Sequence, residues 1–360
     1  MVTRVPTAGV TLEIVGELES TRDDWTAAAE RSGNIFATWE WAVTWWRHFG
    51  AGRPLLVTVC RDGDGRLLGV LPLYLSTARP LRVLRFLGSG PTDRQGPVCA
   101  PEDRPALARG LLEALAGTLP RWDVLLAERL PCEEGWDRLL GAEPIRREAC
   151  PVLELAGRSW DELLASATAN FRQQVRSRER RLVRSHRLRY RLAGDPARLA
   201  GDVATLVRLH EARWGPAGSG AFNARRRAFH EDFAALALRR GWLRLWFLEL
   251  DDRPAAAWYG FRYGGAEWFY QGGRDPTYDR LSVGFVLMVH TVRESANAGL
   301  ARYHLLRGDE PYKARFASAD PGLTTAALVR GARGRAALAA ARAARALPPR
   351  GRQLLVRFAG

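Results

Sequence analysis

Three neighbouring runs, AAAWYGFRYG (255–264), AEWFYQGG (266–273) and SVGFVLMVHTVRESANAG (282–299), decide the fold of this chain. The first two are rich in aromatic residues and are separated by glycine, which predicts two strands joined by a tight turn. The third is apolar nearly all round at its start, which indicates a buried helix. RYHLLRG (302–308) follows as the next strand, so the order is strand, strand, helix, strand.

The same order of elements is predicted in the first half of the chain. PLLVTVC (54–60) and RLLGVLPLYL (66–75) flank DGDG, a strong hairpin signal, just as RLWFLEL (244–250) and the 255–264 run flank DDRP. A helix at 101–117 and a strand at 122–130 then follow. Two halves with this shared order predict a duplicated α+β unit.

The domain organisation follows from the chain length and from this repetition. A length of 360 residues suits two domains of ordinary size. We expect one domain over 1–155, a second over 156–330, and a basic helix or tail over 331–360 that ends near Pro348 and Pro349.

Composition narrows the class of protein. Hydrophobic and charged fractions of 47% and 26% are typical of soluble globular proteins, and no stretch reaches the ~18–20 apolar residues of a membrane span. The N-terminus lacks the apolar core of a secretory signal, so a cytoplasmic protein is expected. The four cysteines form no CxxC and the six histidines no HExxH, which predicts that there is no metal site.

Positive charge is concentrated in one segment. The formal net charge is +15, and NFRQQVRSRERRLVRSHRLRYR (170–191) holds nine arginines with Glu179 as its single acid. Such a run is usually a solvated helix face, but arginine forks also bind phosphates. We therefore take Arg172, Arg176 and Arg180 as candidates for binding tRNA or another anionic substrate.

The chain's single lysine lies in GDEPYKARF (308–316). This motif, with the 255–299 region and with FATWEWAVTWWRHFG (36–50), resembles a GNAT-like acyltransferase family described as cellulose-biosynthesis-associated acetyltransferase-like. That family is distantly related to the Fem aminoacyltransferases, which build peptidoglycan cross-bridges from aminoacyl-tRNA. The resemblance spans roughly residues 10–330. It implies an α+β fold of tandem GNAT-like domains, each a mixed, mostly antiparallel sheet flanked by helices.

The resemblance also implies roles at residues 312 and 313. Lys313 would place positive charge beside the reacting carbonyl, and Tyr312 would protonate a leaving thiolate. The chemistry of acyl transfer, independently of the resemblance, makes Asp309 and Glu310 candidates to deprotonate the attacking amine or to bind its ammonium form. The alternatives are a surface lysine, a packed tyrosine and two acids that cap a turn, since Gly-Asp-Glu-Pro is good turn chemistry.

Two further sites are expected. In GNAT enzymes a glycine-rich loop at a helix N-terminus holds the pyrophosphate of acyl-CoA, and here DRLSVG (279–284) offers Arg280, Ser282 and Gly284. This loop has one glycine where the family pattern has two. In the first half, Asp93 and Arg94 of GSGPTDRQG (88–96) are candidates for lining an acceptor pocket.

Together these residues lead us to expect an N-acyltransferase that moves an acyl group from acyl-CoA, such as acetyl-CoA, to an amine. The acceptor would be an amine-bearing small molecule or a peptide. An aminoacyl-tRNA-dependent, Fem-like aminoacyltransferase is one alternative. A non-catalytic GNAT-like adaptor in polysaccharide or natural-product biosynthesis is another.

Overall fold

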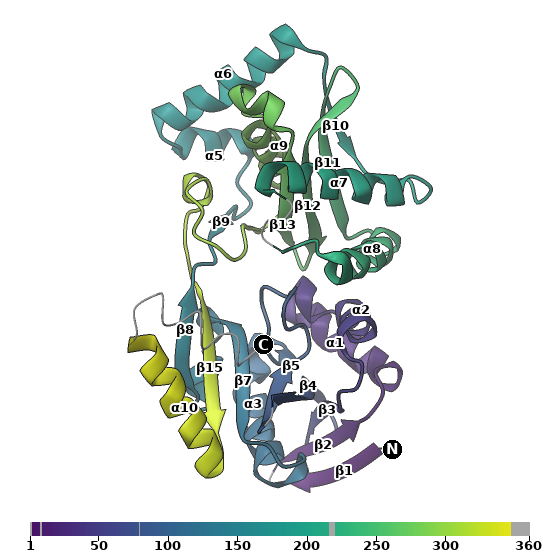
Figure 1. The fold of residues 1–360 in the computed structure, drawn as a ribbon, viewed down its shortest axis with the longest axis vertical. Helices are drawn as coiled ribbons and strands as arrows, with labels where there is room; N and C mark the ends of the chain where they lie inside the picture. The colour runs from purple at the N-terminus through teal and green to yellow at the C-terminus, as the bar shows by residue number, and fades with distance from the viewer. Residues whose placement is uncertain (1, 8, 79, 216–219, 347–360) are drawn as a thin grey trace. The chain divides into compact units, whose positions relative to one another are not determined.

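The computed structural model describes residues 2–7, 9–78, 80–215 and 220–346. The chain divides into two compact units, one of residues 1–149 with 321–360 and one of residues 150–320 (Figure 1). None of the helices in the described ranges has the length and apolar character needed to cross a bilayer. Within the same ranges, no group of three or more His, Cys, Asp or Glu side chains is placed to hold a metal ion.

The first unit is built on a mixed sheet with the strand order β1-β2-β3-β4-β5-β7-β15-β8, and β6 pairs with β4 beside this path. The strands are β1 Val2–Thr7, β2 Val10–Val15, β3 Leu55–Asp62, β4 Leu67–Ala78, β5 Leu81–Phe86, β6 Val98–Cys99, β7 Val124–Pro131, β8 Glu143–Glu148 and β15 Leu323–Val329. The helices are α1 Arg22–Ser32, α2 Trp39–Phe49, α3 Arg104–Glu113, α4 Trp136–Leu139 and α10 Gly331–Ala346. Short helical turns occur at η1 Glu19–Thr21, η2 Ile35–Ala37, η3 Pro101–Asp103, η4 Ala114–Thr118 and η5 Cys132–Glu134.

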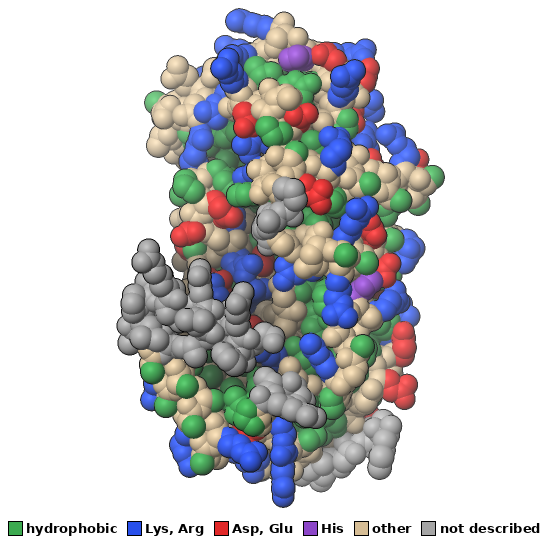
Figure 2. Space-filling model, in the orientation of Figure 1, with side chains coloured by type: hydrophobic (Ala, Val, Ile, Leu, Met, Phe, Trp, Pro, Cys, Tyr) green, Lys and Arg blue, Asp and Glu red, His purple; other side chains and the backbone are tan. Residues whose placement is uncertain are grey.

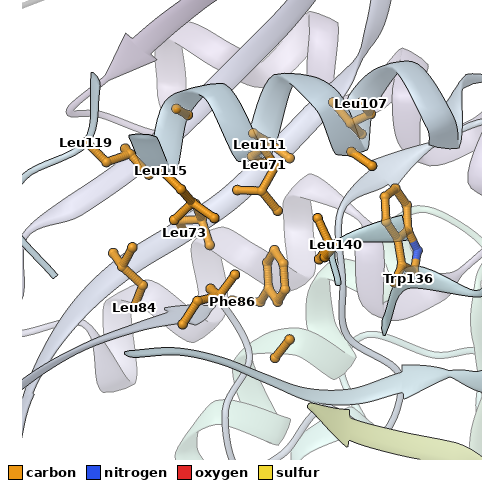
Figure 3. Close-up of a cluster of buried hydrophobic side chains, with 14 of the residues drawn as sticks. Leu71, Leu73, Leu84, Phe86, Leu107, Leu111, Leu115, Leu119, Trp136 and Leu140 are labelled. Atoms are coloured by element: carbon orange, nitrogen blue, oxygen red, sulfur yellow. The ribbon is translucent and has the colours of Figure 1, made fainter. Parts of the chain in front are cut away.

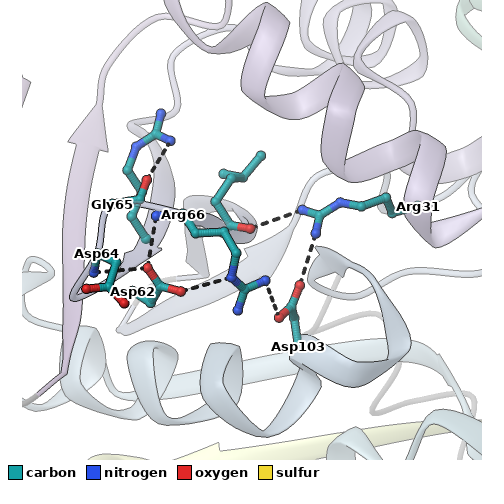
Figure 4. A network of polar contacts seen from close by, with 8 residues as sticks. Arg31, Asp62, Asp64, Gly65, Arg66 and Asp103 are labelled. Carbon is teal, nitrogen blue, oxygen red and sulfur yellow. Dashed lines mark hydrogen bonds and ion pairs between the residues drawn. The ribbon is translucent and has the colours of Figure 1, made fainter.

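The DGDG turn joins β3 to β4, as the sequence predicts, and side chains hold it (Figure 4). The Asp62 carboxylate accepts hydrogen bonds from the backbone N–H groups of Asp64 and Arg66. The Arg66 guanidinium bridges Asp62 and the buried Asp103, at 2.9 Å from each, and Arg31 binds Asp103 from α1 at 3.1 Å. These contacts tie the hairpin to α1 and to the start of α3.

The core of the first unit lies between the sheet and α3. Leu107, Leu111 and Leu115 recur every four residues, so they lie on one face of the helical segment formed by α3 and η4. That face packs on the buried strand residues Leu71, Leu73, Leu84 and Phe86 (Figure 3).

The second unit is built on a smaller sheet with the order β10-β11-β12-β13-β14-β9. Its strands are β9 Val152–Glu154, β10 Leu188–Leu192, β11 Leu243–Leu250, β12 Arg253–Tyr263, β13 Ala266–Arg274 and β14 Arg302–His304. Its helices are α5 Trp160–Ser166, α6 Ala169–Ser185, α7 Leu199–Trp214, α8 Ala224–Arg239 and α9 Val283–Asn297, with short turns η6 Pro276–Leu281 and η7 Lys313–Arg315. The pair β13–β14 is parallel, and the other pairs of this sheet are antiparallel.

Helices cover both faces of this second sheet. Because side chains alternate along a strand, Trp258 and Tyr259 of β12 point to opposite faces. Trp258 belongs to the core that α9 and α6 cover, whereas the ring of Tyr259 contacts His230 of α8 at 5.7 Å. The α9 helix is therefore buried between the sheet and α6, in agreement with its apolar sequence.

The two units repeat one order of elements. In the first, the antiparallel strands β3, β4 and β5 precede α3, and β7 then pairs with β5 in parallel. In the second, β11, β12 and β13 precede α9, and β14 then pairs with β13 in parallel. The predicted α+β class, with a mixed sheet flanked by helices in each half, is confirmed.

The unit boundaries differ from the contiguous division that we predicted. Strand β9 lies before residue 155 but pairs with β14 of the second unit, and β15 lies before residue 330 but pairs with β7 and β8 of the first. The basic run begins inside α6, which is separate from α5 because Thr168 is extended and caps the start of α6. Part of the basic tail forms α10, and residues 347–360 lie outside the described residues.

Buried histidines predict that this unit loses stability in acid. Burial lowers the pKa of His290 to about 4; Arg293 lowers it further and Glu179 opposes the shift. The imidazole of His290 stacks on Tyr190 at 3.8 Å, and its Nε2 has no hydrogen-bond partner among the described residues. Burial likewise lowers the pKa of His230 to about 3.

Between pH ~6.5, where an exposed histidine titrates, and pH 4, the unfolded chain therefore binds protons that the folded chain does not. Stability should be full above pH ~6.5 and should fall as the pH drops toward 4. Urea unfolding at pH 7 and pH 5 checks this. His290→Phe keeps the stacking and removes one titrating group, so it should reduce the difference between the two pH values. An unchanged difference would contradict this role for His290.

Candidate active site

An opening in the second sheet lies where β13 and β14 part. Their parallel pairing covers only Ala266–Trp268 against Arg302–His304, while β13 continues to Arg274. After β14 the chain turns away, and the Leu305 N–H donates to the Pro151 carbonyl. Tyr270 has no partner in β12 because the register shifts there, and a bulge of this kind bends the strand that carries it.

A cleft of about 840 Å³, counted out to its solvent-filled mouth, occupies this region. Its apolar part includes Trp258 and Phe269, whose rings stack at 5.3 Å. The first turn of α9 supplies another side through Ser282, Gly284 and Phe285. The cleft therefore combines an apolar surface with the beginning of a buried helix.

The start of α9 provides a partial positive charge. Ser282 is the N-cap residue in a left-handed conformation, with φ of 56°, and its side chain makes no capping hydrogen bond. The first N–H groups of a helix that lack a side-chain cap remain available, and the helix dipole adds positive potential there. Phosphate groups bind readily at such a helix end.

Arginine dominates the charge of the cleft lining, which contains Arg178, Arg213, Arg274 and Arg315 against the single acid Asp279. Arg274 is engaged with that acid, with Nε 2.6 Å from the Asp279 carboxylate. Among the described residues, no carboxylate forms an ion pair with the other three.

Aromatic rings hold these three arginines. The guanidinium groups of Arg178 and Arg315 lie 4.6 and 4.8 Å from the centre of the Phe285 ring, and Arg213 lies 4.4 Å from Trp214. Burial lowers the pKa of Arg213, and burial together with the positive charge of Arg315 lowers that of Arg178. Charges that lack an anion and are partly desolvated bind an anionic ligand more strongly than they would in water.

Tyr312 lies at the cleft, whereas Lys313 does not line it. The Tyr312 ring is 5.5 Å from the Arg213 guanidinium. Burial, with a further contribution from Glu310, raises the pKa of its hydroxyl above the ordinary value. The hydroxyl is therefore protonated at neutral pH, and burial makes it a weaker acid than an exposed tyrosine.

The Lys313 ammonium is buried inside its own loop, with 4% of the residue exposed. Its Nζ donates to the carbonyls of Arg307 at 2.6 Å and Leu306 at 3.4 Å, and it lies 2.9 Å from the Glu310 carboxylate. Glu310 is thus bound to the lysine, and Asp309 is exposed outside the cleft lining. The geometry favours a loop-holding role for Lys313, and its catalytic role stays a prediction.

The other sequence candidates divide between the two units. Ser282 and Gly284 line the cleft, whereas Arg280 is exposed outside it, and the predicted cofactor-binding role of all three stays a prediction. Asp93 and Arg94 are buried in the first unit, where Arg94 pairs with Glu133 at 2.8 Å. Their acceptor-binding role stays a prediction.

The candidate arginines of α6 do not form one group. Arg172 donates to the carbonyls of Ala165 and Ala167, so it caps the end of α5. Arg176 and Arg180 are exposed. No carboxylate among the described residues pairs with either.

Sequence reasoning missed Arg178, Arg213, Arg274 and Arg315. Arg178 was present in the basic run, and Arg274 and Arg315 lie within a few residues of the motifs that we singled out. Arg213 ends a helix more than 40 residues before the nearest strand of the opening, so nothing local marks it.

In the first unit, loop 87–97 fills the corresponding opening between β5 and β7. The parallel pairing of these strands covers only Val83–Arg85 against Val124–Leu126. The Gln95 N–H then donates to the Arg129 carbonyl, and the Arg129 side chain donates to the carbonyls of Gly90 and Thr92. Loop 87–97 is therefore bonded to β7 at the position that is open in the second unit.

Gly273 of β13 provides a test of the packing around the cleft. A Cβ at this position would lie 2.4 Å from backbone atoms of Leu209 and His210 in α7, which cannot move independently of the helix. We expect Gly273→Ala to lower the free energy of unfolding by about 1–3 kcal/mol. Gly284→Ala is the control, because its Cβ would meet only the Arg274 side chain at 3.6 Å and should cost little. Equal urea midpoints for the two variants would contradict this packing.

Residues 169–314 match the family model described as "Acetyltransferase (GNAT) domain", a segment that runs from α6 to the residue after Lys313. No curated protein matches the sequence. The fold is similar to FemX, with a TM-score of 0.61, 11% identity, and coverage of 87% of this chain and 96% of that chain.

Two further solved structures share the fold with TM-scores of 0.55. One is the C-terminal domain (DUF2156) of a putative lysylphosphatidylglycerol synthetase from Agrobacterium fabrum, 13% identical, with 89% of this chain and 96% of that chain covered. The other is L-PGS from Bacillus licheniformis, 11% identical, with 91% and 97% covered. The GNAT domain match, together with this fold, supports acyltransferase activity.

Proposed function

We propose that the second unit is an N-acyltransferase that takes an acyl group from acyl-CoA in the α9 cleft and delivers it to an amine. The main support is the lining of the cleft. Arg178, Arg213 and Arg315, which have no carboxylate partner among the described residues, line it together with the N-terminus of α9, which has no side-chain cap. This combination suits the phosphates of CoA. The GNAT domain match over the same residues supports this choice of donor.

The residues of the cleft suggest how the transfer would proceed. The arginines and the start of α9 would anchor the phosphates, so that the thioester lies along the open edge of β13. An amine must attack in its neutral form, and the departing thiolate must receive a proton. Tyr312 is the candidate to give that proton, because it lines the cleft and a tyrosine hydroxyl is protonated at neutral pH.

The acceptor and the finer family are also proposals. An amine-bearing small molecule or peptide fits the chemistry, and Asp93 and Arg94 stay candidates for binding it. The resemblance to the cellulose-biosynthesis-associated group rests on GDEPYKARF, the 255–299 region and residues 36–50. A cytoplasmic location remains an inference from the sequence.

A specific observation favours a second donor, aminoacyl-tRNA. Arg176, Arg180 and Arg184 recur every fourth residue of α6, so they lie on one face at about 6 Å intervals. All three are exposed, and Figure 2 shows several blue side chains in the region that Figure 1 labels α6. A row of unpaired arginines suits the phosphates of a nucleic acid.

A titration at two salt concentrations separates the donors. Acetyl-CoA carries roughly two to four charges that the protein could neutralise, so its binding should weaken only modestly between 50 and 200 mM salt. Charged tRNA would be bound through six or more phosphates, and its affinity would fall by about 10³-fold over the same range. Acetyl-CoA binding with transfer to an amine supports the first proposal. If neither donor binds more tightly than about 1 mM, the enzyme proposal fails and the adaptor alternative is favoured.

A further inference from the structure

A second hollow in the same unit lies beside the proposed donor cleft, between α5, the start of α6 and η7. It measures about 1180 Å³ counted out to its mouth. Much of its lining is apolar. Trp160, Leu164 and Phe171 belong to this lining; their side chains are partly buried and pack against the hydrophobic core of the unit. We call this hollow the α5–α6 groove.

The charge of the groove has one sign. Arg158 and Arg315 lie in its lining, and no carboxylate does so among the described residues. Arg158 is engaged with the carbonyls of Glu154 and Leu155. Arg315 contacts Gln174 and has no ion-pair partner in the described part of the chain, so it offers a positive charge at one end of an apolar surface.

The groove and the donor cleft share a wall. Arg315 and Phe316 line both. The Phe316 ring meets Phe171 edge-on at 5.3 Å on the groove side and lies 5.6 Å from Phe285 on the cleft side. The cleft and the groove are therefore adjacent, with the Phe316 ring between them.

We propose that the α5–α6 groove holds the aliphatic chain of a medium- or long-chain acyl group, with its polar head at Arg315. This inference rests on the proposed function, since the chain would belong to the acyl-CoA donor. An apolar lining with a positive charge at one end suits an acyl chain whose thioester carbonyl accepts a hydrogen bond from Arg315, and it equally suits a free fatty acid whose carboxylate pairs with that arginine. Each methylene that leaves water adds about fourfold to affinity. An acetyl group would leave the partly exposed apolar lining in contact with water.

Direct binding of a series of ligands to the full chain tests the inference. Acetyl-, octanoyl- and lauroyl-CoA, and free laurate below its micelle concentration, are titrated by calorimetry. We expect lauroyl-CoA to bind at least tenfold more tightly than acetyl-CoA, and laurate alone to bind measurably. Ala314→Trp places a ring on an exposed position in the groove lining and should bring the acyl-CoA affinities within about twofold of each other.

Val183→Trp is the matched control, because Val183 is 62% exposed on α6 and lies outside the groove lining. It should keep the preference for the longer chain. Equal affinities for acetyl- and lauroyl-CoA, with no laurate binding, would overturn the inference and leave the proposed function intact. Loss of all CoA binding with laurate still bound would overturn the proposed function and keep the groove as a fatty-acid site. If Ala314→Trp keeps the preference for the longer chain unchanged, the acyl chain binds to another surface and the assignment to the α5–α6 groove is refuted.

Discussion

Arg213→Ala is expected to weaken binding of CoA by about tenfold to a hundredfold. The guanidinium lies between the rings of Trp214 and Tyr312, and no carboxylate in the described chain pairs with it. Burial lowers its pKa, and Glu310 and Asp279 offset this shift only in part, so an anionic ligand would stabilise the charge further. A charge-assisted hydrogen bond to phosphate contributes about 1.5–3 kcal/mol. Calorimetric titration of CoA measures the loss.

The matched control for this variant lies on the same helix. Arg208 is exposed on α7 outside the cleft lining, and Arg208→Ala removes the same charge from the protein. It should change CoA affinity less than twofold. If the two variants weaken binding equally, net charge and not the cleft would be responsible.

Lys313→Met is expected to lower the free energy of unfolding by about 2–4 kcal/mol. The change removes a buried ammonium. It leaves the carbonyls of Leu306 and Arg307 without their donor and the Glu310 carboxylate without its ion-pair partner. Losing one partner of a buried polar network is costly because the remaining groups stay desolvated. Leu306 has a positive φ of 58°, so the loop depends on such contacts to keep this shape. Urea unfolding measures the change.

The activity of this variant separates two roles for the lysine. As a positioning residue, Lys313 fixes the loop that carries Tyr312 to the cleft, so stability and turnover should fall together. A purely electrostatic role at the carbonyl predicts lost turnover with unchanged stability, and that result would contradict the loop-holding role. Glu310→Gln is the control: Glu310 has a side chain that is 39% exposed, so the change should cost less than about 1 kcal/mol.

Much of the fold could be predicted because its signals are local. The DGDG turn, the alternation of the strands and the apolar run of α9 each require only neighbouring residues to interpret. The exchange of β9 and β15 between the sheets was not predictable, because their partners are more than 140 and 170 residues away in sequence. The residue pattern of a strand indicates that it belongs to a sheet, but it does not identify the strand with which it pairs.

The site was predicted in part, for the same physical reason. Ser282, Gly284 and Tyr312 were found because they belong to a helix start and a motif that sequence can reveal. Arg213 reaches the cleft from another helix, which only the folded chain shows. The single lysine was conspicuous in composition, yet the direction of its side chain, inward to Leu306 and Arg307, depends on a loop conformation that composition does not encode.

Hydrogen–deuterium exchange with and without acetyl-CoA tests the central claim most directly, because it locates the ligand on the whole chain. We expect slower exchange at the first turn of α9, residues 282–286, and in the 305–316 loop. We expect unchanged exchange in loop 87–97 of the first unit. Protection confined to the first unit, or none under saturating acetyl-CoA, would contradict the assignment of the donor cleft to α9.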